Sequence, residues 1–240
     1  YLVDFLSYIK EKDPSLLNTL IAVQCQNELS LNGAQWPFTI TEGTFTGPDG
    51  RTYDMSKNDQ RQALYENSIL SYHARVAKAV KQVVPSILVG EGIFVPRAVG
   101  KNYDGKHFGI RNMPRDPRCP PKASTILNGA LDFVDIHCYY TKSSMTVEKS
   151  YRLDMKSTGL YLKEMQNLLK EKPYILGEFG SFKFVASTFD QARQNILETR
   201  DLALDDEAQG YMMWTFDTFE QRSIWQAMED ETFLKELSDY

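Results

Sequence analysis

Short apolar runs alternate with stretches of helical periodicity along almost the whole chain. Apolar runs of strand length predict five strands, at residues 21–26, 86–89, 133–139, 174–176 and 210–216. Apolar positions three and four residues apart predict helices at residues 1–12, 56–84, 123–130, 154–172, 188–204 and 223–237. Strands that alternate with helices and are apolar throughout are typical of a parallel sheet buried on both faces.

Two local signals lie in the segment after the first strand. Ser56 is followed three residues later by Asp59, a capping-box spacing that predicts a helix beginning at Ser56. Residues 39–46 have strand character and carry Glu42 and Gly43 at their centre, which predicts a hairpin with its turn at these two residues.

The segments that follow the predicted strands are long, whereas those that precede them are short. Residues 29–53 and 91–121 are the longest of them, and both contain several Gly and Pro residues. In a barrel this asymmetry places the functional face at the carboxyl ends of the strands. A doubly wound open sheet would show the same alternation, but no GxGxxG or P-loop motif follows a predicted strand.

We therefore expect an α/β fold, a (β/α)8 TIM barrel of which this chain supplies about the last five strands. Residues 1–240 are expected to form a single catalytic barrel domain. Because the chain begins on a helix that leads into a strand, we also expect about three βα units upstream of Tyr1.

Polar side chains gather at the predicted strand ends. Glu28 and Glu178 each close a strand, and a carboxylate pair on one barrel rim suits glycoside chemistry, which needs a proton donor and a nucleophile or base. Side chains alternate along a strand, so His137 and Tyr139 share one face while Cys138 points to the helices. The same alternation places Leu176 beneath Glu178, and Trp214 on the face of the last strand that looks into the barrel mouth.

Each of these residues also has a structural interpretation when it is taken alone. A strand-end glutamate is often a solvated charge, and His137 or Trp214 could belong to the core. Their positions at corresponding depths on one face favour a functional site. Glu91 is a third carboxylate, after the second predicted strand, and we interpret it as a loop charge or a partner of Arg97.

Composition narrows the class of protein. Hydrophobic residues are 42% and charged residues 25% of the chain, as in soluble globular proteins. The net charge of −5 and the lack of a dense Lys/Arg run argue against nucleic-acid binding. No apolar stretch approaches the roughly 18 residues of a membrane span. The three cysteines have no CxxC spacing, so neither a disulfide framework nor a zinc site is implied.

The strand-end motifs resemble those of clan A glycoside hydrolases, most closely family 5, the cellulase-like group. That family ends its fourth strand with Asn-Glu, its sixth with His-x-Tyr, its seventh with Gly-Glu-Phe-Gly and its eighth with Trp. The chain has these motifs in the same order, at Asn27-Glu28, His137-Cys138-Tyr139, Gly177-Glu178-Phe179-Gly180 and Trp214. It departs from the family at Leu29, where a proline is common.

The resemblance implies a retaining enzyme that cleaves a β-linked glucan or mannan by double displacement. Glu178 would be the nucleophile and Glu28 the acid/base. The resemblance further implies substrate-binding roles for these residues: Asn27 at the sugar 2-hydroxyl, His137 and Tyr139 beside Glu178, and Trp214 as a sugar platform. We expect Trp36, in the first insert, to do the same at another subsite. It implies no metal or cofactor, and a carbohydrate as the partner. We expect a secreted or extracellular protein, and the oligomeric state stays open.

Two alternatives share the same residues. A carbohydrate-binding barrel without hydrolytic activity would keep the cleft and lose the chemistry. A transglycosylase would form the same covalent intermediate and pass it to a sugar acceptor instead of water.

Overall fold

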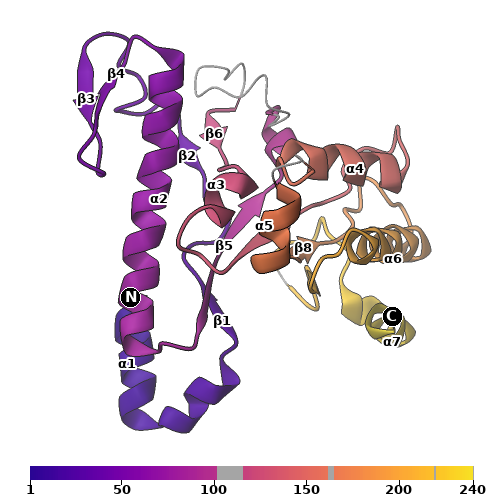
Figure 1. Ribbon diagram of the computed structural model, residues 1–240. Helices are drawn as coiled ribbons and strands as arrows, with labels where there is room; N and C mark the ends of the chain where they lie inside the picture. The colour runs from indigo at the N-terminus through magenta and orange to yellow at the C-terminus, as the bar shows by residue number, and fades with distance from the viewer. Residues whose placement is uncertain (102–115, 162–164, 219, 240) are drawn as a thin grey trace.

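A curled, five-stranded parallel sheet forms the centre of the molecule in the computed structural model, which describes residues 1–101, 116–161, 165–218 and 220–239 (Figure 1). The strand order is β1-β5-β7-β8-β9, so each strand of this sheet pairs with the strand of the sheet that follows it along the chain. The strands are β1 (Ala22–Gln24), β5 (Leu88–Phe94), β7 (Phe133–His137), β8 (Tyr174–Phe179) and β9 (Tyr211–Met213). The prediction of five successive parallel strands is confirmed.

Helices connect the strands and cover the outside of the sheet (Figure 1). The α-helices are α1 (Leu2–Lys12), α2 (Asn58–Val83), α3 (Ala123–Leu127), α4 (Val147–Ser157), α5 (Met165–Glu171), α6 (Phe189–Asp205) and α7 (Glu231–Ser238). Short 3-10 helices are η1 (Pro14–Thr19), η2 (Pro96–Val99) and η3 (Ala227–Glu229). None of the helices in the described residues is long and apolar enough to cross a membrane.

A second, smaller unit of structure is built around the amino-terminal half of α2. Here β2 (Leu31–Asn32) pairs with β6 (Arg118–Cys119), and β3 (Thr44–Thr46) pairs with β4 (Thr52–Asp54), both antiparallel. A cluster of buried side chains holds this unit together: Leu29, Phe38, Tyr53, Met55, Leu64, Tyr65, Ile69 and Cys119. The insert after β1 is therefore packed against α2 by its own apolar core.

Both local predictions in this insert are wrong. Ser56 does not cap α2, because its backbone N–H and hydroxyl both donate to Asp54 Oδ1 and the helix begins two residues later. The hairpin lies at residues 44–54 instead of 39–46, since Gly47 donates to the carbonyl of Arg51 and forms the turn there. The Asp54 side chain accepts from the backbone N–H of Ser56, and such a local bond competes with the predicted cap.

Three other predicted helices differ in extent from those observed, and the one predicted at 123–130 ends already at Leu127. The predicted helix at 154–172 is replaced by α4 and α5, and its residues 162–164 lie outside the described part of the chain. The predicted helix at 223–237 starts only at Glu231, where Asp230 accepts a bond from the N–H of Thr232 and caps α7. The second insert, at 91–121, includes residues 102–115, which are also outside the described residues.

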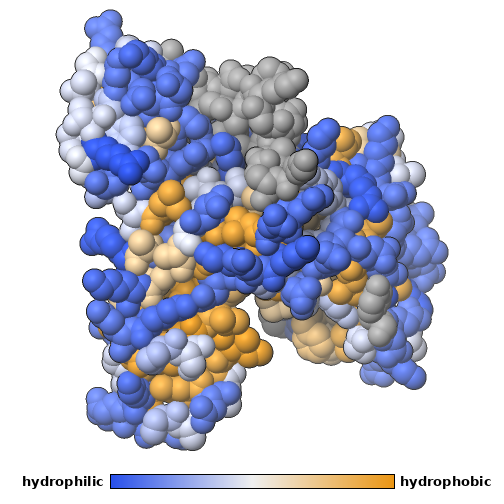
Figure 2. Space-filling model, in the orientation of Figure 1, coloured by the Kyte–Doolittle hydropathy of each residue, from blue (hydrophilic) through white to orange (hydrophobic). Residues whose placement is uncertain are grey.

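The two faces of the sheet differ in chemistry. Side chains that point to the helices are apolar and buried, as are Val134 and Ile136 on β7 and Cys138 just after it. The opposite face, called the inner face below, carries Asp135 and His137 on the same strand. In the space-filling view, apolar side chains also gather in a hollow beside the α1 end of the molecule (Figure 2).

Glu91 is not a loop charge, and it does not pair with Arg97. Strand β5 continues through Phe94, so Glu91 lies within the strand and points toward α2. Its Oε2 lies 2.9 Å from Nε2 of His73, and both side chains are fully buried. Arg97 pairs with Asp154 instead. Burial raises the pKa of Glu91, and the contact with His73 opposes the increase.

Replacing Glu91 with alanine should lower the free energy of unfolding by about 3 kcal/mol, because it leaves His73 buried without its partner. Chemical denaturation followed by circular dichroism measures the change. Glu148→Ala is the matched control, since its i,i+4 partner Arg152 is exposed and such pairs contribute about 1 kcal/mol or less. Equal effects of the two substitutions would contradict this account.

Candidate active site

Glu28 stands just beyond the end of β1, where the chain continues along β5. The N–H of Leu29 donates to the carbonyl of Gly92, which holds this segment against the neighbouring strand. The backbone of Glu28 has φ of 50°, in the left-handed region that few residues other than glycine adopt. This turn breaks the alternation of side chains and points the carboxylate toward His137.

A β-bulge on β8 places Glu178 on the inner face. Asp135 pairs with Ile175 and His137 with Glu178, so two steps along β7 match three steps along β8. Leu176 and Phe179 both belong to the buried core, whereas Gly177 faces Asp135 and Glu178 faces His137. The prediction that Leu176 lies beneath Glu178 is therefore wrong, because the extra residue of the bulge shifts the alternation by one position.

His137 lies between the two glutamates. Its Nδ1 is 3.2 Å from Oε1 of Glu28 and 3.2 Å from Oε2 of Glu178. The hydroxyl of Tyr139 donates to Oε2 of Glu178 at 2.9 Å. His137 is 2% exposed, whereas the side chains of Glu178 and Glu28 are 17% and 37% exposed. Solvent can therefore reach the two carboxylates, whereas the imidazole ring beneath them is buried.

The charge on His137 follows from its surroundings. Burial alone would lower its pKa, but the carboxylates of Asp135, Glu178 and Glu28 outweigh burial and raise the pKa to about 11. Burial and the nearby charge of Glu178 also raise the pKa of Tyr139. At neutral pH His137 is thus an imidazolium ion and Tyr139 a neutral hydrogen-bond donor.

The same three side chains are the group that could hold a metal ion within the described part of the chain. One ligand atom from each of Glu28, His137 and Glu178 lies within 4.8 Å of the others. Because a protonated Nδ1 is a poor metal ligand, the arrangement favours a hydrogen-bonded ion cluster over a metal centre.

A cavity of about 340 Å³ opens beside Glu28. His137 and Tyr139 form part of its wall, together with the aromatic rings of Phe94 and Phe182. Arg118 also lines it and lies over the Phe94 ring at 5.2 Å. Apolar rings beside charged donors are suited to a sugar, which has apolar faces and polar edges.

The remaining predicted site residues are Trp214, Asn27 and Trp36, and they do not lie equally close to the two glutamates. Trp214 follows β9, its backbone N–H donates to the carbonyl of Phe179, and the residue is 40% exposed. It therefore stands at the strand end next to that of Glu178. Asn27 is exposed beside Glu28. Trp36 is 70% exposed and contacts Phe45 of the β3–β4 hairpin, and it does not line the described cavity.

Three neighbours of the site were not among the predicted residues. Asp135 could have been found, because it lies two positions before His137 and so shares its face. Gln24 donates from Nε2 to Oδ2 of Asp135 beneath the two glutamates. No local signal marks Arg118, which the β2–β6 pairing brings to the cavity from an insert.

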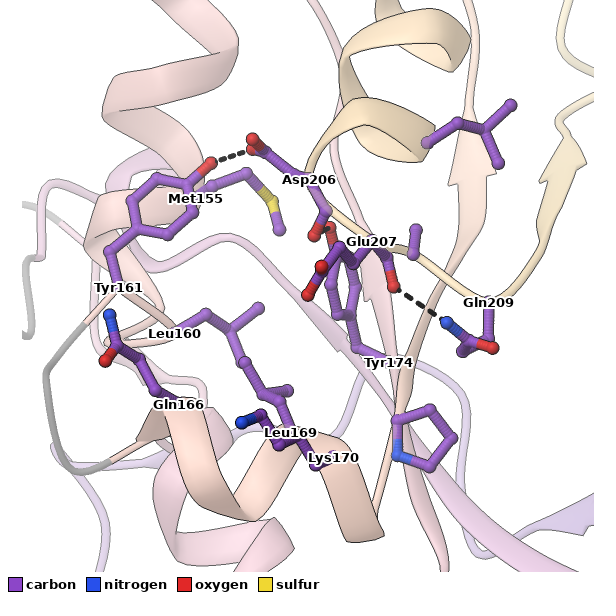
Figure 3. A pocket seen from close by; sticks show the side chains of 13 residues that line it. Met155, Leu160, Tyr161, Gln166, Leu169, Lys170, Tyr174, Asp206, Glu207 and Gln209 are labelled. Carbon is purple, nitrogen blue, oxygen red and sulfur yellow. Dashed lines mark hydrogen bonds between the residues drawn. The ribbon is translucent and has the colours of Figure 1, made fainter.

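A larger cavity, of about 960 Å³, lies elsewhere (Figure 3). Pro173 and Tyr174 at the start of β8 line it, as do residues after the end of α6. Tyr161 donates to Asp206 across it, and Gln209 donates to the carbonyl of Glu207 at 3.1 Å (Figure 3). It is at the amino end of β8, opposite to Glu178, and active sites of such barrels lie at the carboxyl ends.

Comparisons with known proteins agree on the fold. No known family matches the sequence, and no curated protein matches it. A GH5-4 broad specificity endoglucanase from an uncultured bacterium is similar in structure, with a TM-score of 0.57 and 13% identity over 99% of this chain and 61% of its own. An endo-1,4-beta-mannanase from Rhizomucor miehei has a TM-score of 0.53 and 13% identity over 98% of this chain and 58% of its own.

An exo-beta-1,4-mannosidase from Opitutaceae bacterium strain TAV5 is a third such structure, with a TM-score of 0.52 and 14% identity. The alignment includes the whole of this chain and 35% of the mannosidase chain. The chain thus spans between about a third and three fifths of these structures. At such low identity the likeness shows the fold, and the fold is that of part of a TIM barrel.

Proposed function

We propose that this chain carries the catalytic pair of a retaining glycoside hydrolase of family 5 type, acting on a β-linked glucan or mannan. The observation that supports the proposal most is the carboxylate pair: one oxygen of Glu28 and one of Glu178 lie within 4.8 Å. Retaining glycosidases hold their two carboxyl groups about 5–5.5 Å apart, whereas inverting enzymes need about 6.5–9.5 Å to admit a water molecule.

In this proposal Glu178 attacks the anomeric carbon. Its Oε2 is held by the Tyr139 hydroxyl and faces Nδ1 of His137, so Oε1 is the oxygen that forms the bond to the sugar. These two donors orient the carboxylate before substrate binds, so the side chain does not have to rearrange as the transition state forms. The covalent glycosyl-enzyme is then released by water.

Glu28 donates a proton to the leaving oxygen in the first step and takes one from water in the second. Its greater exposure suits a group that must meet the leaving sugar and then water. Asn27 and Trp214 are proposed to contact the sugar, at the 2-hydroxyl and on a ring face respectively, and Trp36 to serve a more distant subsite. Secretion is part of the proposal, since β-linked polysaccharides are extracellular polymers.

The experiment that tests the function is a screen of the full-length protein on β-1,4-glucan, mannan and xylan oligosaccharides. The mannanase and endoglucanase structures lead us to expect cleavage of glucan or mannan. Proton NMR of the early products should show the β anomer first. Binding without cleavage would instead indicate a carbohydrate-binding barrel, and early α anomer would indicate inversion. Transfer to an added sugar acceptor in place of water would indicate a transglycosylase.

A further inference from the structure

Asp135 lies beneath the carboxylate pair, in a space that two glycines leave open. It is buried on β7, on the inner face. A Cβ atom at Gly177 would overlap the Asp135 carboxylate. A Cβ atom at Gly92 would lie 2.9 Å from Oε1 of Gln24 and 3.4 Å from Nε2 of His137. The backbone is therefore shaped to admit the Asp135, Gln24 and His137 side chains together.

One oxygen of the Asp135 carboxylate faces both Gln24 and His137. Its Oδ2 accepts a hydrogen bond from Nε2 of Gln24 and lies 3.7 Å from Nε2 of His137. Its Oδ1 is buried and has no hydrogen-bond partner among the described residues. A buried carboxylate costs several kcal/mol unless a positive charge lies close to it. The neighbouring side chain that can supply this charge is His137.

The imidazole ring connects Asp135 to the surface of the site. On its other side Nδ1 faces Glu28, which follows β1, and Glu178, from β8, whose carboxylate also accepts from Tyr139. On β5, Gly92 lies beside the ring and carries no charge, since a Cβ atom there would be 3.4 Å from Nε2. These carboxylates raise the pKa of His137 against the effect of burial.

We propose that Asp135 is a positioning residue that, with Gln24, keeps His137 as an imidazolium ion whose Nδ1–H is shared between Glu28 and Glu178. Its effect on catalysis rests on the proposed glycosidase function, but its effect on the charge of His137 does not. The Nδ1–H holds the attacking carboxylate from one side, and the Tyr139 hydroxyl holds it from the other. Asp135 itself touches no substrate.

Asp135→Asn separates charge from geometry. An asparagine has the same size, and its amide oxygen, placed where Oδ2 lies, can accept from both Gln24 Nε2 and His137 Nε2, because one oxygen of Asp135 faces both groups. The amide nitrogen then takes the place of Oδ1. The substitution therefore removes the negative charge while the atom that faces Gln24 and His137 remains an acceptor.

The experiment is ¹⁵N NMR of histidine-labelled full-length protein against pH, with His137→Gln used to assign the signals. In the wild type, His137 should stay in the imidazolium form until the pH approaches about 11. In Asp135→Asn the midpoint should fall by about two pH units. The kcat should fall about tenfold with KM nearly unchanged, and the alkaline limb of the pH–rate profile should move by the same shift as the NMR midpoint.

Asp132→Asn is the matched control. Asp132 precedes β7, contacts Lys81 and the N–H of Val89, and should leave the titration of His137 unchanged even if stability falls. A wild-type His137 that is neutral at pH 7 would overturn the inference, and this result needs no variant to fold. An unchanged midpoint in Asp135→Asn would also overturn it. If no glycoside is cleaved, the proposed function fails while the NMR comparison still decides the role of Asp135.

Discussion

Glu178→Ala should lower kcat for glycoside hydrolysis by about 10⁴-fold or more, because it removes the only group proposed to attack the anomeric carbon. The fold should persist, since His137 keeps its contacts with Glu28 and Asp135. Steady-state kinetics on an oligosaccharide measure the first effect, and thermal unfolding the second. Glu171→Ala, an exposed glutamate at the end of α5, is the matched control.

An added small anion sharpens this test. Azide is small enough to enter the space left by the carboxylate, attack the sugar, and release the leaving group with the proton from Glu28. The product should be an α-glycosyl azide, which mass spectrometry and NMR identify. Undiminished hydrolysis by Glu178→Ala would refute the assignment of the nucleophile.

Glu28→Gln should have the second largest effect, and the size of the loss should depend on the leaving group. Glutamine keeps the size of the side chain but cannot give up a proton, and general acid catalysis contributes about 10²–10⁴-fold. Oligosaccharides, whose alkoxide leaves poorly, should lose that factor in kcat/KM. Aryl glycosides with acidic phenols need little protonation, so their first step should be nearly normal.

The same variant should accumulate the glycosyl-enzyme, because Glu28 also activates water in the second step. A burst of phenol followed by slow turnover is the expected time course, and intact-protein mass spectrometry should detect the added sugar. Glu42→Gln, an exposed loop glutamate, serves as the control. An equal loss on all leaving groups would contradict the acid/base assignment.

The strands and the closeness of Glu28 to Glu178 could be predicted because their signals are local. A strand buried on both faces is an apolar run, so β7 and β8 are visible in the sequence. Alternation within one strand also placed His137 and Tyr139 on one face. Both then meet Glu178 in the structure, as expected from the order of the strands.

Features that depend on pairing between distant segments could not be predicted. The bulge at Gly177 appears only when β8 is laid against β7, and it reverses the face on which Glu178 would otherwise lie. Similarly, the partner of Glu91 is a histidine on α2, and only the packing of that helix on β5 identifies it. The end of a strand can be read from sequence, but its register against a neighbour cannot.

The left-handed backbone at Glu28 has a consequence for engineering. A residue with a Cβ atom pays about 1–2 kcal/mol in this conformation, and glycine avoids most of that cost. A library selected for heat resistance alone would therefore tend to enrich glycine at position 28 and discard the proposed acid/base group with it. Selection for thermostability in this protein has to be coupled to a turnover screen from the first round.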